Sequence, residues 1–262
     1  MLLTTLLGYC TAAAGLLVIL FLVLLQNLFG NQKLLDPLIK LVCRVLPLGF
    51  GCRVRVTGRE QIDPGKPYIF MSNHVNIFDP VIIYGHVPNF LRAVELESHF
   101  SWPVWGTITR RLGNIPISHK HMARALESLQ KAAELMRRGT SIAILPEGHR
   151  TRDGRMGPFM RGPFRLALNV KADIVPMALR GGFERKSVHS PRVRPGRMEL
   201  AFGRPISFQA VAAQTERELR NTIRQAIEKL LYVGHQQDAS GPDQPTVGPT
   251  SNSTTRPTPP SR

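Results

Sequence analysis

The stretch 71-MSNHVNIFDP-80 places a histidine and an aspartate on one short loop between two regular elements. The apolar run that leads into it, residues 66–71, predicts a buried β-strand. Asp79 followed by proline predicts a helix over residues 80–87, with Asp79 as its N-cap. A histidine after a buried strand, with a carboxylate in reach, is typical of a general base that deprotonates a hydroxyl or thiol. Local spacing alone favours the simpler interpretation, in which Asp79 only caps the helix and His74 is an ordinary loop residue.

Strand-like runs alternate with helical patterns along the rest of the chain. An apolar stripe at helical spacing over residues 121–138 predicts one amphipathic helix, and a Thr215-x-x-Glu218 capping box opens another that ends at Val233. Further strands are expected at residues 53–56, 141–145, 174–179 and 198–202. The alternation predicts an α/β domain with a layered mixed sheet flanked by helices, whose loops at strand ends carry function.

The amino-terminal segment has the composition of a membrane anchor. Residues 2–29 are nearly all apolar, and the first charged side chain is Lys33. This run exceeds the roughly 20 residues needed to cross a hydrocarbon core and lacks the basic start of a secretory signal. We expect an uncleaved membrane-anchoring helical segment, extended by a second apolar stretch at 34–48. The sequence leaves open whether this segment spans the bilayer or lies in one leaflet. Basic residues downstream predict that the remainder faces the cytoplasm.

These patterns give the expected organisation of the chain. The anchor takes residues 1–48 and a single catalytic domain takes residues 49–234, because 262 residues with 43% hydrophobic composition suffice for one sizeable core. Residues 235–262 consist mainly of small and polar types with few apolar side chains. Such a segment buries too little surface to offset its ordering entropy, so we expect a disordered tail.

The charge balance indicates the kind of partner. Lysine and arginine number 34 against 18 acidic residues, a formal net charge of +16. This excess predicts an anionic membrane surface, phosphate-bearing substrates or nucleic acid as partners. No nucleic-acid partner is expected, since aromatic residues that stack on bases are few and no nucleic-acid-binding motif is present. The three cysteines lack C-x-x-C spacing, which disfavours a disulfide framework and a thiolate metal site.

A second polar stretch, 145-LPEGHRTRDG-154, follows the strand expected at 141–145. Between residues 137 and 165 there are seven arginines and two acidic residues. Guanidinium groups suit bidentate binding of phosphate, and neighbouring glycines allow close approach of the backbone. Glu147, at the strand end, is expected to orient one guanidinium. A solvated basic loop is the alternative interpretation.

Together the two stretches resemble signatures of the glycerolipid acyltransferase family, best known through 1-acylglycerol-3-phosphate acyltransferases. The first signature matches at Asn73, His74, Asp79 and Pro80, and the third at Pro146, Glu147, Gly148 and Arg150. The intervening WGTITRRLGNIPISHK is similar to the second signature, with Gly113 and Ile117, and IVPMALRG to the fourth, with Val175 and Pro176. The resemblance covers roughly residues 53–208.

The chain departs from the family pattern at several positions. Asn76 replaces the usual serine, Leu145 the usual phenylalanine and His149 the usual threonine. The second signature normally ends in an arginine associated with phosphate binding, whereas this chain has Ser118-His119-Lys120. Lys120 or His119 is the candidate substitute, which leaves the head group of the acceptor lipid open.

The resemblance implies a glycerolphosphate-acyltransferase-like fold and acyl transfer without an acyl-enzyme. His74, oriented by Asp79, deprotonates the free hydroxyl of 1-acylglycerol-3-phosphate, which attacks the thioester of acyl-CoA or acyl-carrier protein to give phosphatidic acid. The substrate-binding residues implied are Asn73, Gly113, Lys120, Glu147, Gly148 and Arg150. No metal or other cofactor is implied, because the donor is already activated. The rival hypotheses are another lysophospholipid or a lyso-aminolipid as acceptor, and a non-enzymatic, basic, membrane-tethered module that binds anionic lipid.

Overall fold

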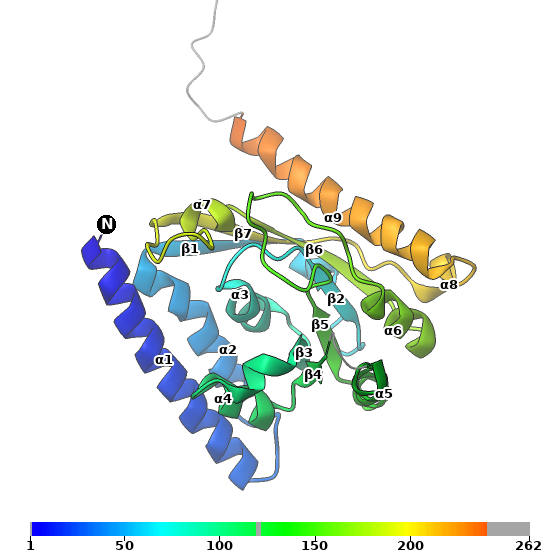
Figure 1. The fold of residues 1–262 in the computed structure, drawn as a ribbon, viewed down its shortest axis with the longest axis horizontal. Helices are drawn as coiled ribbons and strands as arrows, with labels where there is room; N and C mark the ends of the chain where they lie inside the picture. Colours follow the sequence, from blue (N-terminus) through cyan, green and yellow to red (C-terminus); the bar gives the residue numbers. More distant parts are fainter. Residues whose placement is uncertain (1, 119–121, 240–262) are drawn as a thin grey trace, which may run out of the picture.

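A seven-stranded mixed sheet forms the centre of the computed structural model, which describes residues 2–118 and 122–239 (Figure 1). The strands are β1 (Cys52–Thr57), β2 (Ile69–Ser72), β3 (Leu91–Leu96), β4 (Ile115–Ile117), β5 (Ser141–Ile144), β6 (Ile174–Arg180) and β7 (Gly196–Phe202). Their order is β1-β7-β6-β2-β5-β3-β4, and neighbours are parallel except for the antiparallel pair β6 and β7. The predicted α/β fold with a mixed sheet flanked by helices is confirmed.

Helices cover both faces of this sheet. They are α1 (Leu2–Leu28), α2 (Asp36–Val45), α3 (Asp79–His86), α4 (Trp105–Leu112), α5 (Met122–Arg137), α6 (Gly162–Val170), α7 (Gly182–Arg185), α8 (Phe208–Val211) and α9 (Glu216–Ala239), with 3-10 turns η1 (Leu46–Phe50), η2 (Arg59–Gln61) and η3 (Glu97–Ser101). Helices α1 to α4 lie on one side of the sheet, and α5, α6 and α9 on the other (Figure 1).

The central strands are apolar on both faces because each face packs against helices. In β2, Phe70 belongs to the core under α1 to α4, while Ile69 and Met71 belong to the core under α5, α6 and α9. Strands β2 and β5 are adjacent and parallel, with Phe70 paired to Ala143. Their carboxyl ends therefore lie at the same edge of the sheet, and the loops that follow them are brought together there.

The elements differ from the sequence prediction in a few places. Strands β3 and β4 and helices α4 and α6 were not predicted. Helix α9 begins with the predicted capping box, in which Thr215 N–H donates to Glu218 Oε2 (2.8 Å) and Glu218 N–H donates to Thr215 Oγ1 (3.3 Å). The helix continues to Ala239, so residues 235–239, assigned to the tail, are helical. Residues 240–262 lie outside the described residues.

Helix α1 is long and apolar enough to cross a membrane by length and composition. It nevertheless packs on the domain, because Ile19 and Val23 are buried in the same core as Phe70. A side chain at Gly8 would collide with the ring of Phe50, so this glycine allows α1 to lie directly against η1. The expected anchor and the expected catalytic domain therefore share one hydrophobic core.

The outward surface of the same segment is apolar. Exposed side chains on α1 and α2 include Leu3, Leu7, Phe21, Leu38 and Leu41. Many exposed apolar side chains on two successive helices indicate a surface that contacts a membrane or another protein.

Candidate active site

The loop between β2 and α3 holds the predicted pair. His74 Nδ1 lies 2.7 Å from Oδ2 of Asp79, and the Asp79 side chain is only 1% exposed. The same oxygen accepts the backbone N–H groups of Val75 (2.6 Å) and Asn76 (2.9 Å). Asp79 therefore fixes both the imidazole and the loop, and leaves Nε2 as the nitrogen able to accept a proton from a substrate.

The prediction that Asp79 caps helix α3 is wrong. The N-cap position is occupied by Phe78, which makes no side-chain cap hydrogen bond, and Asp79 is the first helical residue. Its carboxylate turns back toward the loop because the Asn76 side chain tightens the chain there, accepting from Phe78 N–H (2.8 Å). Asp79 is therefore available to orient His74.

Two asparagines join this loop to β6 and to the start of helix α7. Asn73 exchanges both hydrogen bonds with the Leu179 backbone, donating to its carbonyl (2.9 Å) and accepting from its N–H (2.8 Å). Asn76 Nδ2 donates to the Gly182 carbonyl (2.7 Å). The Asn73 amide, predicted to bind substrate, is thus engaged with the protein and buried.

Glu147 starts the loop that follows β5, and its side chain is buried. Oε1 accepts the His74 N–H (2.7 Å), and Oε2 accepts the Gly157 N–H (2.6 Å). Burial raises the pKa of Glu147, although these two hydrogen bonds oppose the rise. In the described chain no ion pair joins Glu147 to an arginine, so the expectation that it orients a guanidinium is not met.

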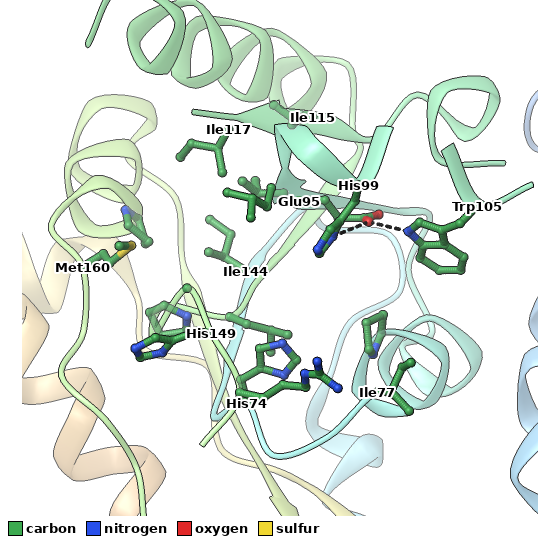
Figure 2. A pocket seen from close by; sticks show the side chains of 18 of the residues that line it. His74, Ile77, Glu95, His99, Trp105, Ile115, Ile117, Ile144, His149 and Met160 are labelled. Atoms are coloured by element: carbon green, nitrogen blue, oxygen red, sulfur yellow. Dashed lines mark hydrogen bonds and ion pairs between the residues drawn. The ribbon is translucent and has the colours of Figure 1, made fainter. Parts of the chain in front are cut away.

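These loops border a cavity of about 1770 Å³. Figure 2 shows His74 and His149 on its loop side, with Ile115, Ile117 and Ile144 further in. Helix α1 contributes part of the wall through Tyr9, Ala12 and Leu16. The interior is largely apolar and has room for a long hydrocarbon chain.

Basic side chains gather along this cavity. Its lining includes Arg150, Arg152, Arg161, Arg165, His149 and His189. Of the described residues that line it, Glu95 is the one acidic side chain. Its carboxylate is occupied by Trp105 Nε1 (2.9 Å) and Thr109 Oγ1 (2.8 Å), next to His99 (Figure 2). The cavity is therefore electropositive and suits a ligand that combines an anionic group with apolar chains.

This geometry agrees with the family comparison, in which residues 53–180 match the Acyltransferase family model. The segment of residues 53–180 is therefore similar to the Acyltransferase family. The predicted resemblance is thereby confirmed, and it covers the segment that contains both loops of the site.

Curated relatives of this chain carry consistent names. A 1-acyl-sn-glycerol-3-phosphate acyltransferase from Chlamydomonas reinhardtii is 26% identical over 181 residues, which is 68% of this chain and 53% of that protein. The Borreliella burgdorferi protein of the same name is 32% identical over 130 residues, 49% of this chain and 52% of that protein. This chain spans about half the length of the curated relatives it matches.

A solved structure shares the fold of this chain. The crystal structure of the 1-acyl-sn-glycerophosphate acyltransferase PlsC from Thermotoga maritima superimposes with a TM-score of 0.76. The match covers 93% of this chain and 98% of that chain at 21% identity. Because it includes nearly the whole chain, the similarity extends beyond the matched domain.

The other predicted site residues lie as follows. Gly148 lines the cavity with a positive φ of 73°, a conformation that glycine adopts without strain. Gly113 instead ends α4 with a φ of 82° and is not part of the cavity lining. Lys120 and His119 lie outside the described residues, while Ser118 before them lines the cavity.

Several residues that line the cavity were not predicted. Arg152, Arg161 and Arg165 belong to the arginine-rich run, but spacing in a loop does not show which guanidinium groups face inward. His99 has no motif around it and reaches the cavity because η3 follows β3 at the same edge as His74. The sequence therefore indicated the three arginines only as members of a run rich in basic residues, and it gave no indication of His99.

Proposed function

We propose that the protein is a membrane-bound O-acyltransferase that converts 1-acylglycerol-3-phosphate into phosphatidic acid for phospholipid biosynthesis. The observation that carries this proposal is the His74–Asp79 pair at the edge of an apolar, arginine-lined cavity. Such a site combines a general base, an anion-binding region and space for acyl chains. The names of the curated relatives support the same reaction.

In the proposed reaction His74 acts as base and then as acid. Nε2 takes the proton of the acceptor hydroxyl while that oxygen attacks the thioester carbonyl carbon of acyl-CoA or acyl-carrier protein. The carbon–sulfur bond breaks as the ester forms, and the departing thiolate receives the proton from His74. The Asp79 carboxylate stabilises the imidazolium between these steps. The thioester is already activated, so the reaction requires no cofactor.

The acceptor phosphate is assigned to the basic part of the cavity. Arg150 and Arg152 extend from the loop after β5, next to the His74 loop, and both line the cavity. A phosphate monoester accepts several charge-assisted hydrogen bonds, which guanidinium groups supply in a planar geometry. The anion then lies close to His74, where the hydroxyl of the same molecule must react.

The membrane surface is the proposed location. The exposed apolar side chains of α1 and α2 suit burial in the bilayer, and the net charge of +16 favours anionic lipid. Basic residues after α1 favour a catalytic domain on the cytoplasmic side. The lysolipid acceptor then reaches the cavity from the bilayer in which it resides.

A second acceptor class is favoured by one departure from the family pattern. The second signature normally ends in arginine, whereas this chain continues from Ser118 into His119 and Lys120. The rival proposal keeps the reaction and replaces the acceptor by another lysophospholipid or a lyso-aminolipid.

An acceptor panel tests both proposals. Purified protein receives radiolabelled acyl-CoA with lysophosphatidic acid, other lysophospholipids or a lyso-aminolipid, and the products are separated. We expect phosphatidic acid as the main product, and His74→Ala to lower turnover about 10²- to 10⁴-fold while membrane binding persists. His86→Gln is the matched control, because His86 is not part of the cavity lining. Undiminished turnover in His74→Ala would refute the proposed base. Lipid binding without turnover across the panel would support a binding module.

A further inference from the structure

The peptide of His74 is bound on both sides by the loop that follows β5. Its N–H donates to Glu147 Oε1 (2.7 Å), and its carbonyl accepts the N–H of Thr151 (2.9 Å). In the sequence, Arg150 lies between Glu147 and Thr151 and directly precedes Thr151. The backbone of the proposed base is therefore tied to the arginine-bearing loop at two points that flank Arg150.

The second oxygen of Glu147 extends this connection to the far end of the same loop. Oε2 accepts the N–H of Gly157 (2.6 Å), and Met160 N–H donates to the Pro146 carbonyl (2.8 Å) where the loop returns. A Cβ at Gly157 would lie 3.1 Å from Oε2, so the carboxylate is packed against the glycine backbone. One carboxylate thus joins the His74 loop to both ends of the arginine-bearing loop.

These contacts leave Glu147 no role in direct substrate binding. Its side chain is buried, with 2% of the residue exposed, and it is not part of the cavity lining. Each of its oxygens already accepts a backbone N–H. A carboxylate would also repel the phosphate that the neighbouring arginines are placed to attract.

We infer that Glu147 is a positioning residue that holds His74 in register with Arg150, and that it does not contact the acceptor. This inference rests on the proposed function, in which the hydroxyl to be deprotonated and the phosphate belong to the same molecule. The distance between the base and the anion site must then match the distance between these two groups. A misplacement of about 1 Å costs about 10²-fold in rate.

The chemistry of the contact explains the need for glutamate at this position. Two N–H donors converge on one side chain, and a carboxylate offers an acceptor to each. A glutamine offers one carbonyl oxygen, and its NH₂ group would face the other N–H, donor against donor. The isosteric variant Glu147→Gln therefore breaks one of the two links without creating a cavity.

Steady-state kinetics of Glu147→Gln separate positioning from binding. We expect kcat to fall about 10- to 100-fold, while KM for lysophosphatidic acid and Ki for glycerol 3-phosphate change less than about 3-fold. Glu134→Gln is the matched control, because Glu134 pairs with Arg138 on the surface of α5. A Ki raised tenfold or more, or an unchanged kcat, overturns the inference.

Amide hydrogen exchange gives a readout that does not depend on turnover. In wild-type protein the His74 N–H is protected by Glu147, so we expect exchange in peptides covering residues 71–78 to accelerate in Glu147→Gln and not in Glu134→Gln. Unchanged exchange contradicts the inference. If wild-type protein transfers no acyl group to any acceptor, the proposed function fails, while exchange still decides whether Glu147 holds the His74 loop.

A milder variant guards against loss of folding. Gly157→Ala places its Cβ against Oε2 and displaces the carboxylate by a few tenths of an ångström. We expect a smaller fall in kcat with the same unchanged Ki. If Gly157→Ala leaves kcat unchanged, or if it raises Ki for glycerol 3-phosphate, the result contradicts a positioning role for Glu147.

Discussion

The hydroxyl of Tyr84 on α3 donates a hydrogen bond to Asp36 Oδ1 on α2 over 2.6 Å. Lys40 Nζ lies 3.2 Å from the other oxygen of Asp36 and donates to the Asn89 carbonyl (2.7 Å). All of these side chains are buried, and burial, followed by the negative charge of Asp36, raises the pKa of Tyr84 well above its usual range. The amino-terminal segment is thereby bonded to the helix that begins with Asp79.

Removing the Tyr84 hydroxyl is expected to destabilise the whole domain. Tyr84→Phe leaves a buried carboxylate oxygen without its donor, so the free energy of unfolding should fall by about 1–3 kcal/mol. Urea unfolding in a fixed detergent, followed by circular dichroism, measures the change. Tyr232→Phe is the control, because Tyr232 is 72% exposed on α9. Equal stability of the two variants would show that the Tyr84–Asp36 bond contributes little.

Asp79→Asn is expected to reduce turnover more than stability. An amide oxygen can replace Oδ2 toward the Val75 and Asn76 N–H groups, but the charge that stabilises protonated His74 is lost. We expect kcat to fall about 10²- to 10⁴-fold in the acyl-transfer assay. Asp63→Asn, in the exposed turn before β2, is the control. Turnover within twofold of wild type in Asp79→Asn would exclude the proposed role of the carboxylate.

Asn76→Ser introduces the residue that the family usually carries and tests why this chain differs. Serine retains an oxygen for the Phe78 N–H but is too short to reach the Gly182 carbonyl, which Asn76 contacts at 2.7 Å. Loss of that bond should lower the free energy of unfolding by about 1–3 kcal/mol. Asn169→Ser on the exposed side of α6 serves for comparison. If both substitutions change the free energy of unfolding equally, the hydrogen bond from Asn76 to Gly182 at the start of α7 contributes little to stability.

Activity and stability should respond to pH in opposite directions through Glu147. The pKa of Glu147 is raised above its ordinary value of 4.5, so the folded protein holds this proton more tightly than the unfolded chain. Its contribution to stability is complete below pH 4.5 and is lost as the pH rises through the folded-state pKa. Wild type should therefore lose stability relative to Glu147→Gln on going from about pH 4 to about pH 8.

Over the same range the kcat of wild type relative to Glu147→Gln should rise. The ionised carboxylate accepts from both the His74 and Gly157 N–H groups, whereas the protonated form carries a hydrogen on one oxygen. Parallel urea titrations and kcat measurements check both trends. A constant difference in stability between wild type and variant would show that Glu147 has the same proton affinity in the folded and unfolded states.

His149 tests how the acceptor head group is recognised. This residue stands where the family usually carries threonine, and it lines the cavity beside Arg150. We expect His149→Thr to raise KM for lysophosphatidic acid about 2- to 10-fold, the effect of one lost hydrogen bond. KM for monoacylglycerol, which has no phosphate, should not change. An equal rise for both acceptors would place His149 against the shared glycerol or acyl part.

The geometry of the loop after β2 was predictable because its signal is local. A buried strand, a histidine and an Asp-Pro pair are adjacent in the sequence, and the structure brings His74 and Asp79 together as expected. Whether Asp79 capped the helix or turned back was not decided by spacing, since it depends on hydrogen bonds within the loop. The hydrogen-bond partners of Glu147 could not be predicted, because they are backbone N–H groups at His74 and Gly157, and every residue except proline carries such a group.

Strand β3 escaped prediction for a different reason. Its sequence contains Arg92 and Glu95, which break the apolar pattern of a buried strand. Arg92 is only 1% exposed, and its guanidinium stacks on Phe90 at 4.1 Å and donates to Gln32. Buried charged side chains of this kind interact with partners distant in the sequence. A prediction from hydropathy alone therefore assigns them to the surface.

Helix α1 supplies Tyr9, Ala12 and Leu16 to the wall of the cavity. In the proposed membrane location the outer face of α1 contacts lipid, so extraction would place surfactant beside one wall of the proposed reaction chamber, whose apolar interior suits alkyl chains. Surfactant monomers should then compete with the lysolipid, and turnover in micelles should fall as their alkyl chains lengthen. Reconstitution into nanodiscs should restore the rate, so measured rates should depend on the solubilising medium.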